Sequence, residues 1–190
     1  MKIMPKKSRL LKQRGYRSKQ GFTLIELIIV TAIMAILASL VVASHRTGQK
    51  QYNLSQAGQK LVSNLREAQN MAMSGVDIGI QYCGYGIQIN RTARPTSYYF
   101  YADKAASCQT SNNKYDGSDE IIETVELPDQ VRFQSTSPAP IDIFFKPPEP
   151  TTYINQNAGA DVSGTITLEV AGASLTKTIT VTTAGLIESN

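Results

Sequence analysis

Residues 21–44 read GFTLIELIIVTAIMAILASLVVAS, and this stretch decides how the rest of the chain is organised. From Phe22 to Ser44 it has 23 residues and one charge, Glu26. As an α-helix it would be about 34 Å long, which is enough to cross a hydrocarbon core of about 30 Å. A surface helix of a soluble protein would show a polar face, and this stretch has none. The sequence therefore predicts a membrane-spanning helix with an acid near one end.

The segment before the apolar run, residues 1–21, contains eight Lys or Arg and no acid. Beside a membrane helix, such a segment predicts a cytoplasmic N-terminus and a head outside. A secretory signal is the competing interpretation, but its apolar part is shorter, about 7–15 residues. The whole chain has 19 bases and 15 acids, so the remainder has 11 bases and 15 acids. This balance counts against a nucleic-acid partner, because Lys and Arg supply most of the affinity for phosphates.

The start of the apolar run, GFTLIEL from Gly21 to Leu27, resembles the processing site of type IV pilins and type II secretion pseudopilins. The resemblance implies that prepilin peptidase cuts between Gly21 and Phe22 and N-methylates Phe22. It implies that Glu26 acts in fibre assembly, with other pilin or pseudopilin subunits as partners. The implied location is the cytoplasmic membrane, crossed once, and then the pilus or pseudopilus.

Residues 45–74 are predicted to continue the helix with a single apolar stripe. The stripe recurs at steps of three and four residues and consists of Leu54, Gly58, Leu61, Leu65, Ala68 and Ala72. The polar residues that fall outside it are Gln59, Lys60, Asn64 and Glu67. Ser74 and Gly75 are expected to end the helix. The stripe suits either a coiled-coil partner or a head in the same chain, and the strands that follow favour the head.

From residue 75 onward, apolar residues alternate with polar ones, as in β-strands. Strands are expected at 78–82, 85–89, 98–101, 121–127, 131–133, 141–145, 166–170 and 179–181, with a bulge or bend at Gly84. The last two should form a hairpin through residues 171–174. Residues 102–119 and 146–164 are expected to be surface loops. The predicted fold is α+β, with the helix packed on seven or eight short antiparallel strands.

The predicted parts are a basic leader (1–21), an apolar transmembrane and assembly helix (22–44), its amphipathic continuation (45–74) and a β-rich head (75–190). The head more weakly resembles the H-type minor pseudopilin group, which includes minor pilins of type IV pili. The residues that carry this likeness are Cys83–Ile87, Tyr98–Asp103, Ile179–Val181 and Gly185–Ile187. Some DNA-uptake pilins of this group have a basic C-terminal tail. Residues 171–190 here contain one base, Lys177, which counts against DNA binding.

Two cysteines, Cys83 and Cys108, lie in the part of the chain that is predicted to be outside. An exported compartment permits a disulfide between them, and we expect this bridge to form. Two free buried thiols are the alternative. A single pair of cysteines cannot by its spacing make a metal site, so no metal is expected there.

The sequence offers no set of residues suited to catalysis, and we expect neither an enzyme nor a cofactor. The one histidine, His45, lies at the predicted membrane boundary, so no second histidine is present to activate a cysteine. No phosphate-binding loop and no zinc spacing occurs. An acidic cluster does not fit the twelve-residue calcium loop and is expected to be a solvated turn; it consists of Asp116, Asp119, Glu120 and Glu123, around Gly117.

Four consecutive aromatic residues, Tyr98 to Tyr101, must place two side chains away from the core side of their strand. An outward pair could form an adhesion surface. We favour burial under the helix on one face and under a loop on the other. The expected function is a processed minor subunit of a type IV pilus or of a type II secretion pseudopilus. The alternative is a membrane-anchored binding domain, such as a DNA receptor or an adhesin.

Overall fold

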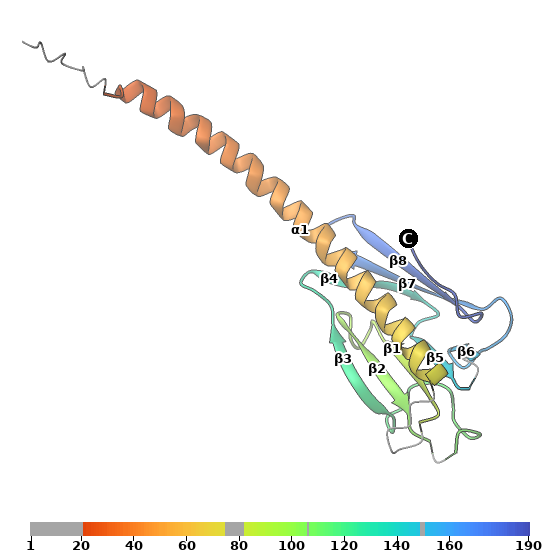
Figure 1. Ribbon diagram of the computed structural model, residues 1–190. Helices are drawn as coiled ribbons and strands as arrows, with labels where there is room; N and C mark the ends of the chain where they lie inside the picture. Colours follow the sequence, from red (N-terminus) through yellow and green to blue (C-terminus); the bar gives the residue numbers. More distant parts are fainter. Residues whose placement is uncertain (1–20, 75–81, 106, 149–150) are drawn as a thin grey trace, which may run out of the picture. The chain divides into compact units, whose positions relative to one another are not determined.

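The computed structural model describes residues 21–74, 82–105, 107–148 and 151–190, with side chains described throughout these ranges except at 40–46. The chain forms two compact units, Met1–Ala43 and Ser44–Asn190. Helix α1 (Leu24–Ser74) is the one helix in these ranges, and every strand belongs to the second unit (Figure 1). The fold is α+β, as predicted.

The second unit contains two antiparallel sheets. Sheet I has the strand order β3-β2-β1-β5-β6. Its strands are β1 (Gly84–Ile89), β2 (Ser97–Asp103), β3 (Glu120–Glu126), β5 (Ile141–Lys146) and β6 (Thr151–Ile154). Sheet II has the order β4-β7-β8-β9. Its strands are β4 (Val131–Ser137), β7 (Ser163–Val170), β8 (Thr176–Thr182) and β9 (Ile187–Ser189). The described ranges thus hold nine strands, rather than the seven or eight expected.

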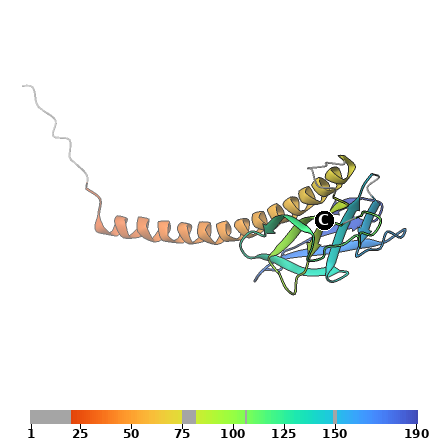
Figure 2. The ribbon, with the colours of Figure 1, turned by 90° about the horizontal axis from the view of Figure 1, so that it is seen from below.

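The C-terminal part of α1 packs on both sheets. Leu61, Leu65 and Ala68 of the predicted stripe have no exposed surface, and they share one core with the apolar residues of sheets I and II. Figure 1 shows this part of α1, in yellow, lying across strands of both sheets, and Figure 2 shows that it covers one side of them. The 3.6-residue period of the stripe explains this packing, because it places one continuous apolar face toward the sheets.

The predicted hairpin is confirmed as β7 and β8, which pair in register from Ser163 with Thr182 to Glu169 with Thr176. The N–H of Val170 donates a hydrogen bond of 3.1 Å to the carbonyl of Leu175 across the turn. Gly172 lies in this turn with φ of 72°, a left-handed conformation that glycine adopts without a steric penalty.

The buried face of α1 differs from the predicted stripe at two residues. Asn64, expected outside the stripe, is 1% exposed, and its Nδ2 donates a hydrogen bond of 3.2 Å to the phenol oxygen of Tyr98. Ala57 is buried as well. The predicted member Gly58 lies against β8, where an added Cβ would be 2.5 Å from Cδ of Lys177. A larger residue at position 58 would have to displace that side chain.

The segment 146–164, expected to be a surface loop, contains strand β6. This strand extends sheet I at its edge by pairing with β5, so that Ile154 lies opposite Ile143 and Thr152 opposite Phe145. Thr152 and Ile154 are buried. Pairing with β5, rather than a local pattern of its own, makes this short segment a strand.

Two expectations near β1 and β2 are also corrected. Asp103, expected to lie in a surface loop, is the last residue of β2 and is buried. Gly84, expected to mark a bulge or bend, is the first residue of β1 and pairs with Asp103 in regular register. The register shifts lie between residues 100 and 101 of β2 and between residues 133 and 135 of β4. Most of the strand expected at 78–82 lies outside the described residues.

Candidate functional site

The predicted cleavage site lies directly before α1, in a short segment without regular secondary structure. Gly21, Phe22 and Thr23 are exposed, and the side chain of Phe22 is 81% exposed. A Cβ added at Gly21 would have no neighbour within 4 Å. The fold of this chain therefore leaves room for a larger residue at position 21. A requirement for glycine there would come from a partner that approaches the backbone closely.

Thr23 fixes the first residue of the helix. Its carbonyl accepts a hydrogen bond of 3.2 Å from the N–H of Leu27, and its Oγ1 accepts one of 3.3 Å from the N–H of Glu26. These are the bonds of a helix N-cap residue, with a Glu three positions later. This role of Thr23 was not among the expectations from the sequence. The signal was present, because a Thr three residues before a Glu at the start of an apolar run marks a helix N-terminus.

Glu26 lies in the first turn of α1 and is exposed. The partial positive charge of a helix N-terminus favours a carboxylate at this position. Along the helix, Glu26 is surrounded by exposed large apolar side chains, among them Leu24, Ile25, Leu27 and Ile28. A contiguous apolar surface of this kind marks a site of interaction with protein or lipid.

Two hydroxyl groups on the same part of α1 are satisfied by the helix itself. Thr31 donates to the carbonyls of Leu27 and Ile28, both at 3.0 Å, and Ser39 donates to the carbonyl of Ile36 at 2.7 Å. They therefore present no unpaired donor on the apolar surface. Within the part of the chain that the structure describes, no helical stretch combines the length and the apolarity that crossing a membrane requires.

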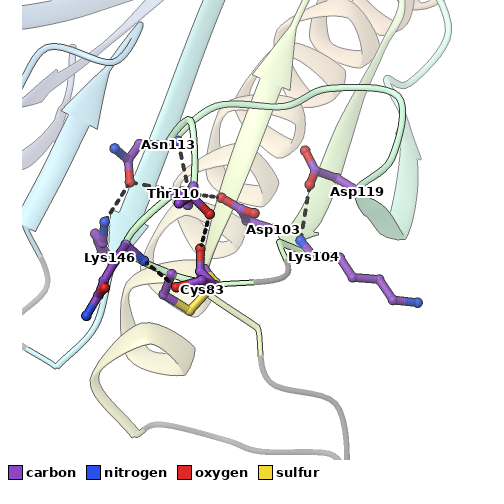
Figure 3. Close-up of a disulfide and its surroundings, with 11 residues drawn as sticks. Cys83, Asp103, Lys104, Thr110, Asn113, Asp119 and Lys146 are labelled. Atoms are coloured by element: carbon purple, nitrogen blue, oxygen red, sulfur yellow. Dashed lines mark hydrogen bonds between the residues drawn. A yellow bond between two sulfur atoms is a disulfide. The ribbon is translucent and has the colours of Figure 1, made fainter.

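Cys83 and Cys108 form a disulfide, with their Cα atoms 4.8 Å apart (Figure 3). Cys83 directly precedes β1 and is 1% exposed, and its N–H donates to the carbonyl of Asp103 at 3.0 Å. The bridge therefore ties the loop between β2 and β3 to the start of β1. This is the pairing that the sequence analysis expected.

Polar side chains also hold the loop in place (Figure 3). Asp103 accepts a hydrogen bond from the hydroxyl of Ser111. Oδ1 of Asp119 accepts one of 3.1 Å from the N–H of Lys104, close to where the loop begins. Nζ of Lys146, on β5, donates one of 3.1 Å to the side chain of Asn113. Loop residues are thus hydrogen-bonded to β2, to β5 and to one another.

The predicted acidic cluster is divided in the structure. Asp116 and Asp119 accept hydrogen bonds within the loop, while Glu120 and Glu123 form ion pairs at 4.0 Å with Lys104 and 3.5 Å with Lys60. In the ranges described, no three His, Cys, Asp or Glu side chains are grouped so that they could hold a metal ion.

The aromatic run is covered on both faces of sheet I. Tyr98 is buried beneath α1, where it accepts the hydrogen bond of Asn64. On the opposite face, the rings of Tyr99 and Tyr101 lie 5.5 and 5.3 Å from that of Tyr115, which belongs to the loop. This is the arrangement that the sequence analysis favoured, with the helix over one face and a loop over the other.

Asp142 of β5 is a buried acid that sequence analysis did not single out. Its Oδ1 accepts a hydrogen bond of 2.7 Å from the phenol of Tyr101, and its Oδ2 accepts one of 3.0 Å from the N–H of Tyr115. Burial raises the pKa of Asp142 to about 7, although both hydrogen bonds favour the charged form. Burial also raises the pKa of Asp103 and of Asp119. Through their hydrogen bonds, the carboxyl groups of Asp142, Asp103 and Asp119 anchor the loop.

His45 and Lys177 were also singled out from the sequence. The side chain of His45 lies outside the described residues. The aliphatic stem of Lys177 lies against Gly58 of α1, so the one base of the C-terminal tail is partly used in packing.

Comparison with known proteins gives one match. A family model described as the prokaryotic N-terminal methylation motif matches residues 16–42, which include Gly21, Phe22, Thr23 and Glu26. No curated protein and no solved structure matches the chain. The motif indicates a type IV pilin-like or pseudopilin-like prepilin, and it implies processing by prepilin peptidase and assembly with other pilins.

Proposed function

We propose that this protein is a minor subunit of a type IV pilus or of a type II secretion pseudopilus. Prepilin peptidase cuts between Gly21 and Phe22 and methylates Phe22, and the subunit enters the fibre through the N-terminal part of α1. The observation that carries the proposal is the methylation-motif match over residues 16–42. The exposed, non-helical junction before an apolar helix supports it. The proposed role is structural rather than enzymatic.

The basic leader and the apolar residues 22–44 support a location in the cytoplasmic membrane before assembly, with the leader inside and the head outside. The short likenesses at Cys83–Ile87 and Tyr98–Asp103 support an H-type minor subunit. We expect no tight binding of DNA by the processed chain, because residues 22–190 contain 11 bases and 15 acids.

Glu26 is the proposed assembly residue, and its partner is the α-amino group of Phe22 that cleavage sets free. Methylation leaves that amine positively charged at neutral pH. Opposite charges 4 Å apart attract by about 4 kcal/mol at an effective dielectric constant of 20, before the cost of desolvation. Phe22 precedes the first residue of α1, so the four-residue spacing of a helix does not by itself bring its amine to Glu26 of the same chain. A pair between neighbouring subunits would also fix the axial stagger of their helices.

The test is to replace Glu26 by Gln in the full chain, in a host that has prepilin peptidase and assembles fibres. We expect normal cleavage and a lower content of the variant in sheared fibres, measured by quantitative immunoblot. Glu67→Gln is the matched control, because Glu67 is also an exposed acid of α1 but lies in the second unit. Equal incorporation of Glu26→Gln and wild type would contradict the assembly role.

A further inference from the structure

We propose that Thr23 is a positioning residue for the cleavage reaction. Its side chain starts α1 at Leu24 and thereby keeps the Gly21–Phe22 peptide outside the helix. The inference rests on the proposed function, because it concerns the same bond. It adds a residue to which neither the family match nor the resemblance to pilins gives a role.

The structure supplies the geometry. Oγ1 of Thr23 accepts the N–H of Glu26 at 3.3 Å, and the first backbone bond of the helix runs from Leu27 to the carbonyl of Thr23 at 3.2 Å. An N-cap residue has non-helical backbone angles although its carbonyl already accepts a helical bond. The two peptide units before it, including the one between Gly21 and Phe22, therefore lie outside the helix, and the structure shows no regular secondary structure there.

A second acceptable cap is available two residues upstream. Glycine is accepted at the N-cap position, whereas valine and other apolar residues are strongly disfavoured. If residue 23 could not cap, Gly21 would be the next suitable cap, and Phe22 would become the first helical residue. The peptide to be cut would then adjoin the first turn of the helix instead of lying in a non-helical segment.

A non-helical segment matters to an enzyme that must bind this peptide. Extended chains offer free backbone N–H and C=O groups to a partner, whereas a helix uses them internally. A peptidase would therefore bind only the molecules in which the junction is outside the helix. When only a fraction of molecules is competent, the apparent dissociation constant rises by the inverse of that fraction. Loss of the cap should accordingly raise KM and leave kcat unchanged.

Three observations support a partner at this junction. The methylation-motif match covers the cap and the bond to be cut. The side chain of Phe22 is 81% exposed, and a Cβ at Gly21 would meet open space within 4 Å. The junction is therefore accessible, and the position of the helix start is a property of the substrate that a peptidase would encounter.

The experiment uses the full chain in detergent-solubilised membranes with purified prepilin peptidase. Initial rates of leader removal are measured over a range of substrate concentrations. Thr23→Val keeps the shape and roughly the helix propensity of threonine but cannot cap. We expect its KM to rise by at most about fivefold, the factor that corresponds to the loss of a typical cap, with kcat unchanged.

Two capping variants and one control complete the set. Thr23→Ser and Thr23→Asn can both accept the N–H of residue 26, so each should keep KM within about twofold of wild type. Asn does so without a hydroxyl group. Thr31→Val is the matched control, because Thr31 bonds only to carbonyls of its own helix and lies beyond the first turn. It should behave as wild type.

Two results would overturn the inference. The first is a wild-type KM for Thr23→Val. The second is a raised KM for both Val and Asn but not for Ser, which would mean that the peptidase binds the hydroxyl group directly. Failure of the proposed function looks different, because wild type itself would then not be cut between Gly21 and Phe22.

Discussion

The phenol of Tyr101 donates a hydrogen bond of 2.7 Å to Oδ1 of Asp142, and both side chains are buried. The other carboxyl oxygen of Asp142 accepts the N–H of Tyr115 at 3.0 Å. One carboxyl group thus joins β2, β5 and the loop that the disulfide ties down. Its protonation state should therefore affect the stability of the head.

We predict that the free energy of unfolding decreases as pH rises from about 4 to about 7. Burial raises the pKa of Asp142 from its usual 3.8 to about 7, so in this range the folded state holds a proton that the unfolded chain releases. The slope from this residue is at most about 1.4 kcal/mol per pH unit. Urea unfolding at a series of pH values measures it.

Asp142→Asn should reduce this slope, because an amide stays neutral throughout. The variant should also be less stable than wild type at acid pH, since its amide nitrogen cannot accept the second hydrogen bond. Some slope should remain, because burial also raises the pKa of Asp103 and of Asp119. Asp161→Asn is a control at an exposed position with φ of 63°, where asparagine is tolerated. Equal slopes in wild type and Asp142→Asn would refute the prediction.

Loss of the disulfide should destabilise the head. The bridge joins residues 25 apart, for which the chain-entropy model gives roughly 3 kcal/mol. For a unit of this size that corresponds to a decrease in Tm of roughly 6–12 °C. Thermal melting with and without reductant measures the effect. The double variant Cys83→Ser, Cys108→Ser should melt at the temperature of reduced wild type. Its Tm should be the same with and without reductant. An unchanged Tm on reduction would show that the bridge contributes nothing.

The bond between Asn64 and Tyr98 should show strong coupling, because both side chains are buried. Tyr98→Phe leaves the amide of Asn64 without this partner and should cost about 1–3 kcal/mol. Adding Asn64→Leu replaces both polar groups by apolar ones and should recover much of the loss. A double-mutant cycle by urea unfolding measures the coupling, which should exceed about 0.5 kcal/mol. Additive effects would mean that the two side chains do not interact energetically.

The sequence predicted those parts of the fold that depend on local period. The stripe on α1 and the β7–β8 hairpin repeat at the spacings of a helix and a strand, and both appear in the structure. Gly21, Phe22 and Glu26 could also be singled out from sequence, because they lie in the short continuous stretch that the methylation-motif model matches. Thr23 belongs to the same segment and could have been found from its spacing to Glu26.

The remainder depends on contacts between distant residues. Asn64 is buried because Tyr98, 34 residues later, accepts its hydrogen bond. Asp142 stands alone in an apolar strand and would be expected to face solvent. It is buried because the loop brings Tyr115, 27 residues earlier, against it. Strand β6 likewise depends on pairing with β5. No local pattern encodes these contacts.

The central claim is that the mature chain begins at Phe22. The measurement is intact mass together with N-terminal sequencing of the full-length gene product, from a host with prepilin peptidase and from the same host without it. The account predicts a chain that starts at N-methylated Phe22 in the first host and retains residues 1–21 in the second. A product that retains residues 1–21 in both hosts, or that begins at another residue when the peptidase is present, would contradict it.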